Sequence, residues 1–409
     1  MVPDKKIVED VSGWLRLYDD GSVDRTWTGP PEVKFMADSV PPHDQYIDGV
    51  ATRDVIADPN SGLRLRIYLP EKTPEEETAK LPLLLHFHGG GFCISQADWF
   101  LYYAFYTRFA RQARAIIVSV YLRRAPEHRL PAAADDAFSA LLWLSSQAKS
   151  CTEPWLEGAD FNRVFLIGDS SGGNLVQETA VRAGKEDLRP LRVAGAIPIQ
   201  PGFVRPERSR SEMEQPETPF LTLEMLDKFI ALALPVGSTK EHPMTCPMGP
   251  AAPPLEELKL PPMLLCLADK DKLLETEMEF YEAMKKANKE IEIVMSCGMS
   301  HIFYLNKIAV DKTLLSLFLF LVSPPEPSDL TGGVALDAEI SHRHSLSLLG
   351  GLRSGSLLGR GSTVRKGIAG VGGRCEEGGR WGFWAVRKGV DGYDLGEWGL
   401  VAAGEGGSL

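Results

Sequence analysis

The chain has 409 residues, of which 44% are hydrophobic and 24% charged, and its formal net charge is −11. This composition is typical of a soluble globular protein with room for one α/β domain and an extra segment. The acidic balance, without a Lys/Arg cluster, excludes a nucleic-acid partner. Residues 1–13 lack the apolar core of a secretory signal, and the apolar run at 314–322 is too short to span a membrane. We therefore expect a cytoplasmic protein, with the nucleus as a second candidate location, and no membrane partner.

The cysteines are scattered and include no Cys-x-x-Cys pair. This spacing indicates neither a zinc site nor a redox pair, so no metal is expected. In a chain without a secretory signal we expect free thiols in a reducing compartment. The six positions are Cys93, Cys151, Cys246, Cys266, Cys297 and Cys375.

The N-terminal part of the chain shows the alternation of half-buried strands. Residues 14–18 and 23–27 flank an Asp-Gly pair and predict a hairpin near the mouth of a site. A second strand pair is predicted at 53–57 and 63–69. We expect residues 1–50 to form a cap or lid and the main domain to span 51–322.

From residue 81 onward, apolar runs without polar alternation are separated by helical stretches. Such runs are typical of strands that are buried on both faces. Their alternation with helices predicts an α/β fold with a mostly parallel sheet covered on both sides. The predicted strands are 83–87, 115–121, 163–167, 193–199, 263–268 and 291–295. The predicted helices are 97–112, 132–147, 171–183, 274–287 and one after His301.

Two segments interrupt this alternation. Residues 205–242 contain an amphipathic stretch at 223–234, which predicts a helical cap inserted over the site. Residues 323–409 are rich in glycine and serine and have few periodic apolar positions, so we expect them to be disordered.

A sharp turn follows the predicted strand at 163–167. There the chain reads Gly-Asp-Ser-Ser-Gly, with Ser170 at its centre. Gly-x-Ser-x-Gly after a strand is the signature of a nucleophile elbow, in which the flanking glycines leave room for a strained serine. The pattern predicts that Ser170 is a catalytic nucleophile.

A run of three glycines follows the predicted strand at 83–87. Backbone N–H groups without a nearby Cβ can stabilise the oxyanion of a tetrahedral intermediate. A flexible glycine turn is the alternative, and the presence of both motifs in one chain argues against it. The predicted oxyanion hole comprises His88, Gly89, Gly90, Gly91 and Ser171, with the N–H groups of Gly90, Gly91 and Ser171 as donors.

An acid and a histidine are expected after the nucleophile, at the ends of later strands. The strand at 263–268 is followed by Asp269 and Asp271, and the strand at 291–295 leads to His301. From the residues alone, either aspartate could orient His301, which would act as the general base.

The combined motifs resemble plant carboxylesterases of the hormone-sensitive-lipase group, over residues 1–310. The resemblance rests on His88 to Phe92, Arg124 to His128 (RAPEH), Gly168 to Asn174 and Gly298 to Leu305. Residues 24–37 (DRTWTGPPEVKFMA) are more similar to the hypersensitivity-related branch, which includes strigolactone-degrading enzymes. The resemblance implies an α/β-hydrolase fold with a helical cap.

The resemblance also assigns the acid, because the family's Asp-x-x-x-acidic pattern before Thr-Glu-Met-Glu maps onto Asp271. The expected triad is therefore Ser170, Asp271 and His301. Two neighbours of the histidine depart from the family. Ser300 stands where glycine is usual, and Ile302 is uncommon after the histidine.

The leading hypothesis is hydrolysis of small to medium hydrophobic esters through an acyl-enzyme, without a cofactor. A strigolactone is one candidate substrate. One alternative is a gibberellin-receptor-like binding protein, a class that resembles these esterases but has lost the histidine. The glycine-rich tail suggests another, an inactive product with an aberrant C-terminus. The predicted pocket residues are Phe92, Trp99, Phe203 and Phe220.

Overall fold

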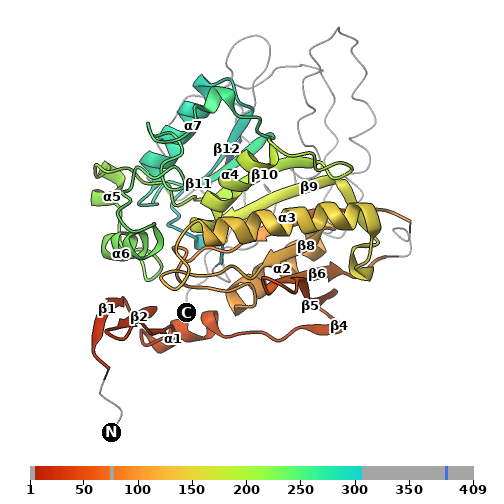
Figure 1. Ribbon diagram of the computed structural model, residues 1–409, viewed down its shortest axis with the longest axis horizontal. Coiled ribbons are helices and arrows are strands. Elements are labelled where there is room, and N and C mark those ends of the chain that lie inside the picture. Colours follow the sequence, from red (N-terminus) through yellow and green to blue (C-terminus); the bar gives the residue numbers. More distant parts are fainter. Residues whose placement is uncertain (1–4, 74–77, 306–382, 386–409) are drawn as a thin grey trace, which may run out of the picture. The chain divides into compact units, whose positions relative to one another are not determined.

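The computed structural model describes residues 5–73, 78–305 and 383–385 (Figure 1). Within these ranges the main sheet has ten strands in the order β13-β12-β11-β10-β9-β7-β8-β6-β5-β4. The strands are β4 (His43–Ile47), β5 (Val50–Asp58), β6 (Leu63–Pro70), β7 (Leu81–Phe87), β8 (Ile116–Val120), β9 (Ala159–Asp169), β10 (Val193–Ile199), β11 (Met263–Ala268), β12 (Ile291–Ser296) and β13 (Phe383–Ala385).

The centre of the sheet is parallel. β12, β11, β10, β9, β7 and β8 pair in parallel in that order. β6, β5 and β4 extend one side with antiparallel pairs, and β13 pairs antiparallel with β12. All seven side chains of β7 are buried, as expected for a strand covered on both faces. The mostly parallel sheet predicted from the sequence is therefore confirmed.

Helices cover both faces of the sheet. The core on one face joins Leu83 and Leu85 of β7 to α3 (Ala132–Ser150), α4 (Ser171–Ala183) and α7 (Leu274–Lys286). The core on the other face joins Leu84 to α2 (Phe100–Ala113). In Figure 1, α3 runs in front of the strands. The two cores arise from the alternation of side chains along each strand.

The N-terminal residues contribute to two sheets. β1 (Ile7–Val11), β2 (Leu15–Tyr18) and β3 (Val23–Asp24) form a separate antiparallel sheet, and only the β2–β3 hairpin was predicted. β4 lies before residue 50 but pairs with β5 in the main sheet, so the segment expected to be a lid also supplies a sheet edge. Its sequence, His-Asp-Gln-Tyr-Ile, is mostly exposed and lacks apolar alternation, which is why periodicity missed it.

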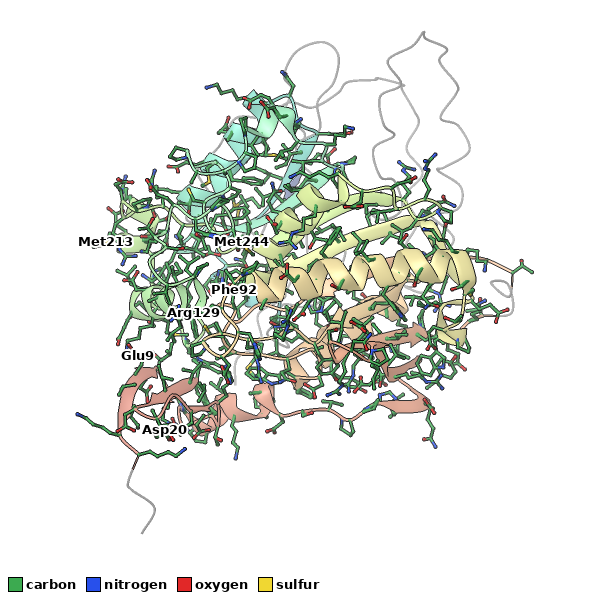
Figure 2. The ribbon with its side chains drawn as sticks, viewed as in Figure 1. Glu9, Asp20, Phe92, Arg129, Met213 and Met244 are labelled. Atoms are coloured by element: carbon green, nitrogen blue, oxygen red, sulfur yellow. The ribbon has the colours of Figure 1, made fainter. Side chains whose placement is uncertain are left out.

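The segment inserted after β10 contains two helices, α5 (Arg210–Glu214) and α6 (Leu223–Ala233). α6 begins directly after Thr222, whose hydroxyl accepts a hydrogen bond from the N–H of Met225 at 3.1 Å. The N-terminal sheet contacts this cap. Lys228 Nζ of α6 lies 2.8 Å from Glu9 Oε1 of β1, and Figure 2 shows Glu9 on the side of β1 toward α6.

Short helical turns complete the described chain: α1 (Pro31–Lys34), η1 (Phe35–Ala37), η3 (Pro154–Leu156), η4 (Leu255–Glu257) and η5 (Phe303–Leu305). A helix was expected after His301. The described chain holds only η5 there, and residues 306–382 lie outside the described ranges. So does the expected disordered tail at 323–409, apart from β13. Among the helices described, none is long and apolar enough to cross a membrane.

A sharp turn joins β9 to α4. Ser170, between the two elements, has φ 51° and ψ −123°, a conformation that L-residues rarely adopt. The turn brings Gly172 so close to β7 that a Cβ there would lie 2.0 Å from the carbonyl oxygen of Phe87. A side chain at position 172 would therefore have to displace a backbone atom of β7, which favours glycine there.

We predict that Gly172→Ala lowers the free energy of unfolding by about 1–3 kcal/mol, because the new methyl group must displace the β7 backbone. Urea denaturation measures the change. Gly158→Ala is the matched control, since a Cβ at residue 158 would meet only the flexible end of Lys72 at 3.3 Å. Equal stabilities of the two variants would contradict the close approach.

Candidate active site

Three polar side chains meet at the carboxyl edge of the parallel sheet. His301 Nε2 lies 3.0 Å from Ser170 Oγ, and His301 Nδ1 lies 2.7 Å from Asp271 Oδ2. Ser170 follows β9, Asp271 follows β11 and His301 lies on the loop after β12. As a carboxylate, Asp271 can only accept, so Nδ1 carries the proton and Nε2 accepts the serine hydroxyl. This arrangement can draw a proton from Ser170.

The two aspartates after β11 have different partners. Asp271 is fully buried and also accepts a hydrogen bond from the N–H of Leu273 at 3.0 Å. Asp269 instead accepts from the N–H groups of Gly298 and Met299, at the turn before His301. Of the two acids that the residues alone left open, Asp271 contacts the imidazole and Asp269 holds the turn.

Gln200 also lies within this cluster and was missed by the sequence analysis. Its Nε2 donates to Asp271 Oδ2 at 2.9 Å and to the carbonyl oxygen of Ser300 at 3.1 Å. Its Oε1 accepts from the N–H of Ile302 at 2.7 Å. Gln200 directly follows β10, so a polar residue at the end of a predicted parallel strand was the available signal.

The glycine loop after β7 faces Ser170. Gly90 and Gly91 have φ values of 96° and 59°, and a Cβ on Gly91 would lie 2.4 Å from Cγ of Phe229. Within the described residues, the N–H groups of Gly90 and Gly91 donate to no acceptor of the protein. The hydroxyl of Ser171 accepts from the N–H of Phe92 at 3.1 Å and ties the loop to the elbow. The N–H groups of Gly90 and Gly91 are therefore available to donate to an anion beside Ser170.

His88 and Gly89, which were expected to take part in an oxyanion hole, do not line the pocket. The N–H of Gly89 already donates to Tyr102 Oη at 3.0 Å, and this hydroxyl donates to Asp169 Oδ2 at 3.1 Å. Burial lowers the pKa of His88 to about 4, so its ring is neutral at neutral pH. Both residues support the loop and present no donor to the pocket.

A pocket opens above Ser170 and encloses about 790 Å³, including solvent at its mouth. Phe92, Trp99 and Phe220 line it, as expected. Phe203 does not. Its side chain is fully buried and packs in the core with its ring 4.7 Å from that of Phe280. A bulky apolar residue after a strand suits a pocket or a core equally well, so the sequence did not separate the two.

Aromatic side chains from distant segments complete the pocket wall. Trp14, in the turn just before β2, has its ring 6.0 Å from Trp99 and 6.1 Å from Phe220. Its Nε1 donates to the carbonyl oxygen of Pro219 in the cap at 3.1 Å. Phe229 of α6 also lines the pocket. Neither Trp14 nor Phe229 was singled out from the sequence, although the hairpin and the cap helix were expected near the site.

The cysteines match the expectation of free thiols only in part. Cys93, Cys151, Cys246 and Cys266 are free, whereas Cys297 is disulfide-bonded. Burial raises the pKa of the Cys93 thiol beside the glycine loop to about 12, so it stays protonated. Among the described residues, no three His, Cys, Asp or Glu side chains cluster as a metal site would. The cytoplasmic location stays a prediction.

Comparison with known proteins gives the same picture. A family model described as alpha/beta hydrolase fold matches residues 84–305. Probable carboxylesterase 6 of Arabidopsis thaliana is 35% identical and aligns over 73% of this chain and 85% of its own length. 2-Hydroxyisoflavanone dehydratase of Glycyrrhiza echinata is 34% identical, with 73% of this chain and 90% of the relative covered.

Solved structures agree on the fold. EstE1, a thermostable carboxylesterase cloned from a metagenomic library, has a TM-score of 0.56 and 29% identity, covering 68% of this chain and 90% of its own. An arylesterase has a TM-score of 0.58 at 22% identity, with 71% and 89% covered. The resemblance to plant carboxylesterases and the predicted fold are thus confirmed. The chain belongs to the α/β-hydrolase fold family.

Proposed function

We propose that this α/β hydrolase is a serine carboxylesterase in which Ser170, His301 and Asp271 form the catalytic triad. One observation carries the proposal: the continuous series of hydrogen bonds from Ser170 Oγ through His301 to Asp271, at 3.0 and 2.7 Å. A serine hydroxyl is a weak nucleophile until a base accepts its proton, and this series provides the base and its orienting acid.

In the proposed reaction, Ser170 Oγ attacks the ester carbonyl carbon while its proton passes to His301 Nε2. The N–H groups of Gly90, Gly91 and Ser171 stabilise the resulting oxyanion. The C–O bond to the alcohol then breaks, and His301 returns the proton to the departing oxygen. Water, deprotonated by the same nitrogen, hydrolyses the acyl-enzyme and releases the acid. Asp271 stabilises the imidazolium at both stages.

The pocket favours esters of small to medium size that carry no charge near the reacting carbonyl group. Its wall is mostly apolar and includes Trp14, Trp99, Phe220 and Phe229. Such a surface binds hydrophobic groups through the area it removes from water. The relatives named carboxylesterase support the same class. Within it, we propose a strigolactone-type hormone ester as a candidate, on the resemblance of residues 24–37 to the hypersensitivity-related branch.

A non-catalytic receptor is the alternative function. A gibberellin receptor of Arabidopsis thaliana is 33% identical over 64% of this chain and 77% of its own length. His301 argues against this function here, because its contact with Ser170 is what turnover needs and what ligand binding alone does not. The residues of the proposed triad and oxyanion hole all precede residue 306, so an aberrant C-terminus would leave this set of side chains present.

We predict that Ser170→Ala lowers kcat on p-nitrophenyl butyrate by about a thousandfold or more, because removal of the nucleophile leaves only the contributions of binding and the oxyanion hole. Ser145→Ala is the matched control. The Ser145 hydroxyl is buried and donates to the carbonyl oxygen of Leu188, outside the pocket. Equal rates for wild type and Ser170→Ala would refute the serine mechanism.

We also predict that the wild-type protein consumes a synthetic strigolactone and that Ser170→Ala leaves it intact, since both reactions use the same nucleophile. Chromatography of timed incubations measures the remaining substrate. Survival of the compound with enzyme that hydrolyses p-nitrophenyl butyrate would remove strigolactones from the candidate substrates and leave the esterase function in place.

A further inference from the structure

We infer that Gln200 is a positioning residue for the proposed triad: its side-chain amide holds the carboxylate of Asp271 and the two peptide groups that flank His301 in one fixed arrangement. This inference rests on the proposed esterase function. Gln200 does not line the pocket, so it acts through Asp271 and His301 and not on the substrate.

Almost all of the hydrogen-bonding capacity of the Gln200 side-chain amide is satisfied. Both N–H groups of Nε2 donate, to Asp271 Oδ2 at 2.9 Å and to the carbonyl oxygen of Ser300 at 3.1 Å. Oε1 accepts from the N–H of Ile302 at 2.7 Å. The side chain is 1% exposed, so water does not replace these bonds readily when they are lost. The planar amide of Gln200 thus forms hydrogen bonds with the histidine loop on both sides of His301.

The loop needs such support. Ile302 has φ 49°, in the left-handed region that is unfavourable for a β-branched residue. Strained backbone of this kind persists only where the surroundings hold it in place, and the N–H of Ile302 is held by Gln200. Gln200 contacts only backbone atoms of Ser300 and Ile302, so these hydrogen bonds do not depend on the side chains at the two positions.

Gln200 is itself fixed to the sheet. Its backbone has φ 43°, and its N–H donates to the carbonyl oxygen of Cys266 in β11 at 2.7 Å. β11 leads directly to Asp271. The amide therefore connects the ends of β10 and β11 with the loop after β12. A shift in any of these connections moves the imidazole relative to Ser170.

Only an amide satisfies this environment, because it must donate to two oxygens and accept from one N–H. A glutamate of the same shape would place an oxygen against Asp271 Oδ2 and the Ser300 carbonyl, which are both acceptors. Glu277 of α7 is close enough to Asp271 for their charges to interact, and burial raises its pKa well above the usual range. The buried surroundings of Asp271 thus offer little to compensate a further negative charge.

The test compares Gln200→Met and Gln200→Glu with the wild-type protein on p-nitrophenyl butyrate. We expect kcat to fall about a hundredfold in Gln200→Met, the cost of displacing a catalytic group by about 1 Å, and further in Gln200→Glu. KM should stay within about threefold, since the pocket wall is unchanged. The low-field proton resonance of His301 Nδ1–H, assigned by its loss in His301→Ala, should shift or disappear in both variants.

Gln147→Met is the matched control for a lost buried amide. Gln147 is 5% exposed, and its Oε1 accepts from the N–H of Glu153 at 2.9 Å and from Thr152 Oγ1 at 3.0 Å, at the end of α3. We expect Gln147→Met to lower the urea midpoint while kcat and the His301 resonance stay as in wild type. A merely structural role for Gln200 would give the same result in Gln200→Met.

The outcomes separate the inference from the function on which it rests. Wild-type kcat and resonance in either folded Gln200 variant, with activity still abolished in Ser170→Ala, overturn the positioning role and leave the esterase standing. Should Gln200→Met fail to fold, the isosteric Gln200→Glu decides by the same criteria. Full activity of Ser170→Ala overturns the proposed function and the positioning role together.

Discussion

The hydrogen bond from the Ser170 hydroxyl to His301 Nε2, at 3.0 Å, is the interaction on which the proposed chemistry depends. Its partners are 131 residues apart, so the parallel sheet must bring their loops to one edge. Parallel strands do this because their carboxyl ends coincide, and β9, β11 and β12 each end beside the site. Burial of the apolar strands thereby stabilises the sheet, and the edge of this sheet brings the three polar side chains together.

The sharp turn at Ser170 and the glycine loop after β7 stabilise each other. Gly172 packs directly against the carbonyl oxygen of Phe87, and Ser171 Oγ accepts from the N–H of Phe92. These contacts hold the strained backbone of Ser170 at the carboxyl ends of β7 and β9, which pair with each other. Tyr102 supports the loop from behind, through Gly89 and Asp169. Preorganised donors of this kind need no rearrangement when charge develops on the substrate.

The sequence predicted the parallel strands, the main helices, Ser170 and His301 from local patterns and the order of the motifs, whereas the choice of Asp271 over Asp269 came from the family resemblance. Long apolar runs locate buried strands, and Gly-x-Ser-x-Gly requires a particular backbone turn. It did not predict which side of a loop a residue faces. Phe203 belongs to the core, while the N–H of Gly89 is occupied by Tyr102. Gln200 and Trp14 were missed because their roles depend on partners about 70 to 200 residues away.

The most direct measurement of the activated serine is covalent labelling with a fluorophosphonate probe, followed by mass spectrometry of the digested protein. Wild type should carry one adduct, on the peptide that contains Ser170, and His301→Ala should label far more slowly because the base is missing. An adduct on another residue, or equal labelling rates in wild type and His301→Ala, would contradict a nucleophile at Ser170 that is activated by His301.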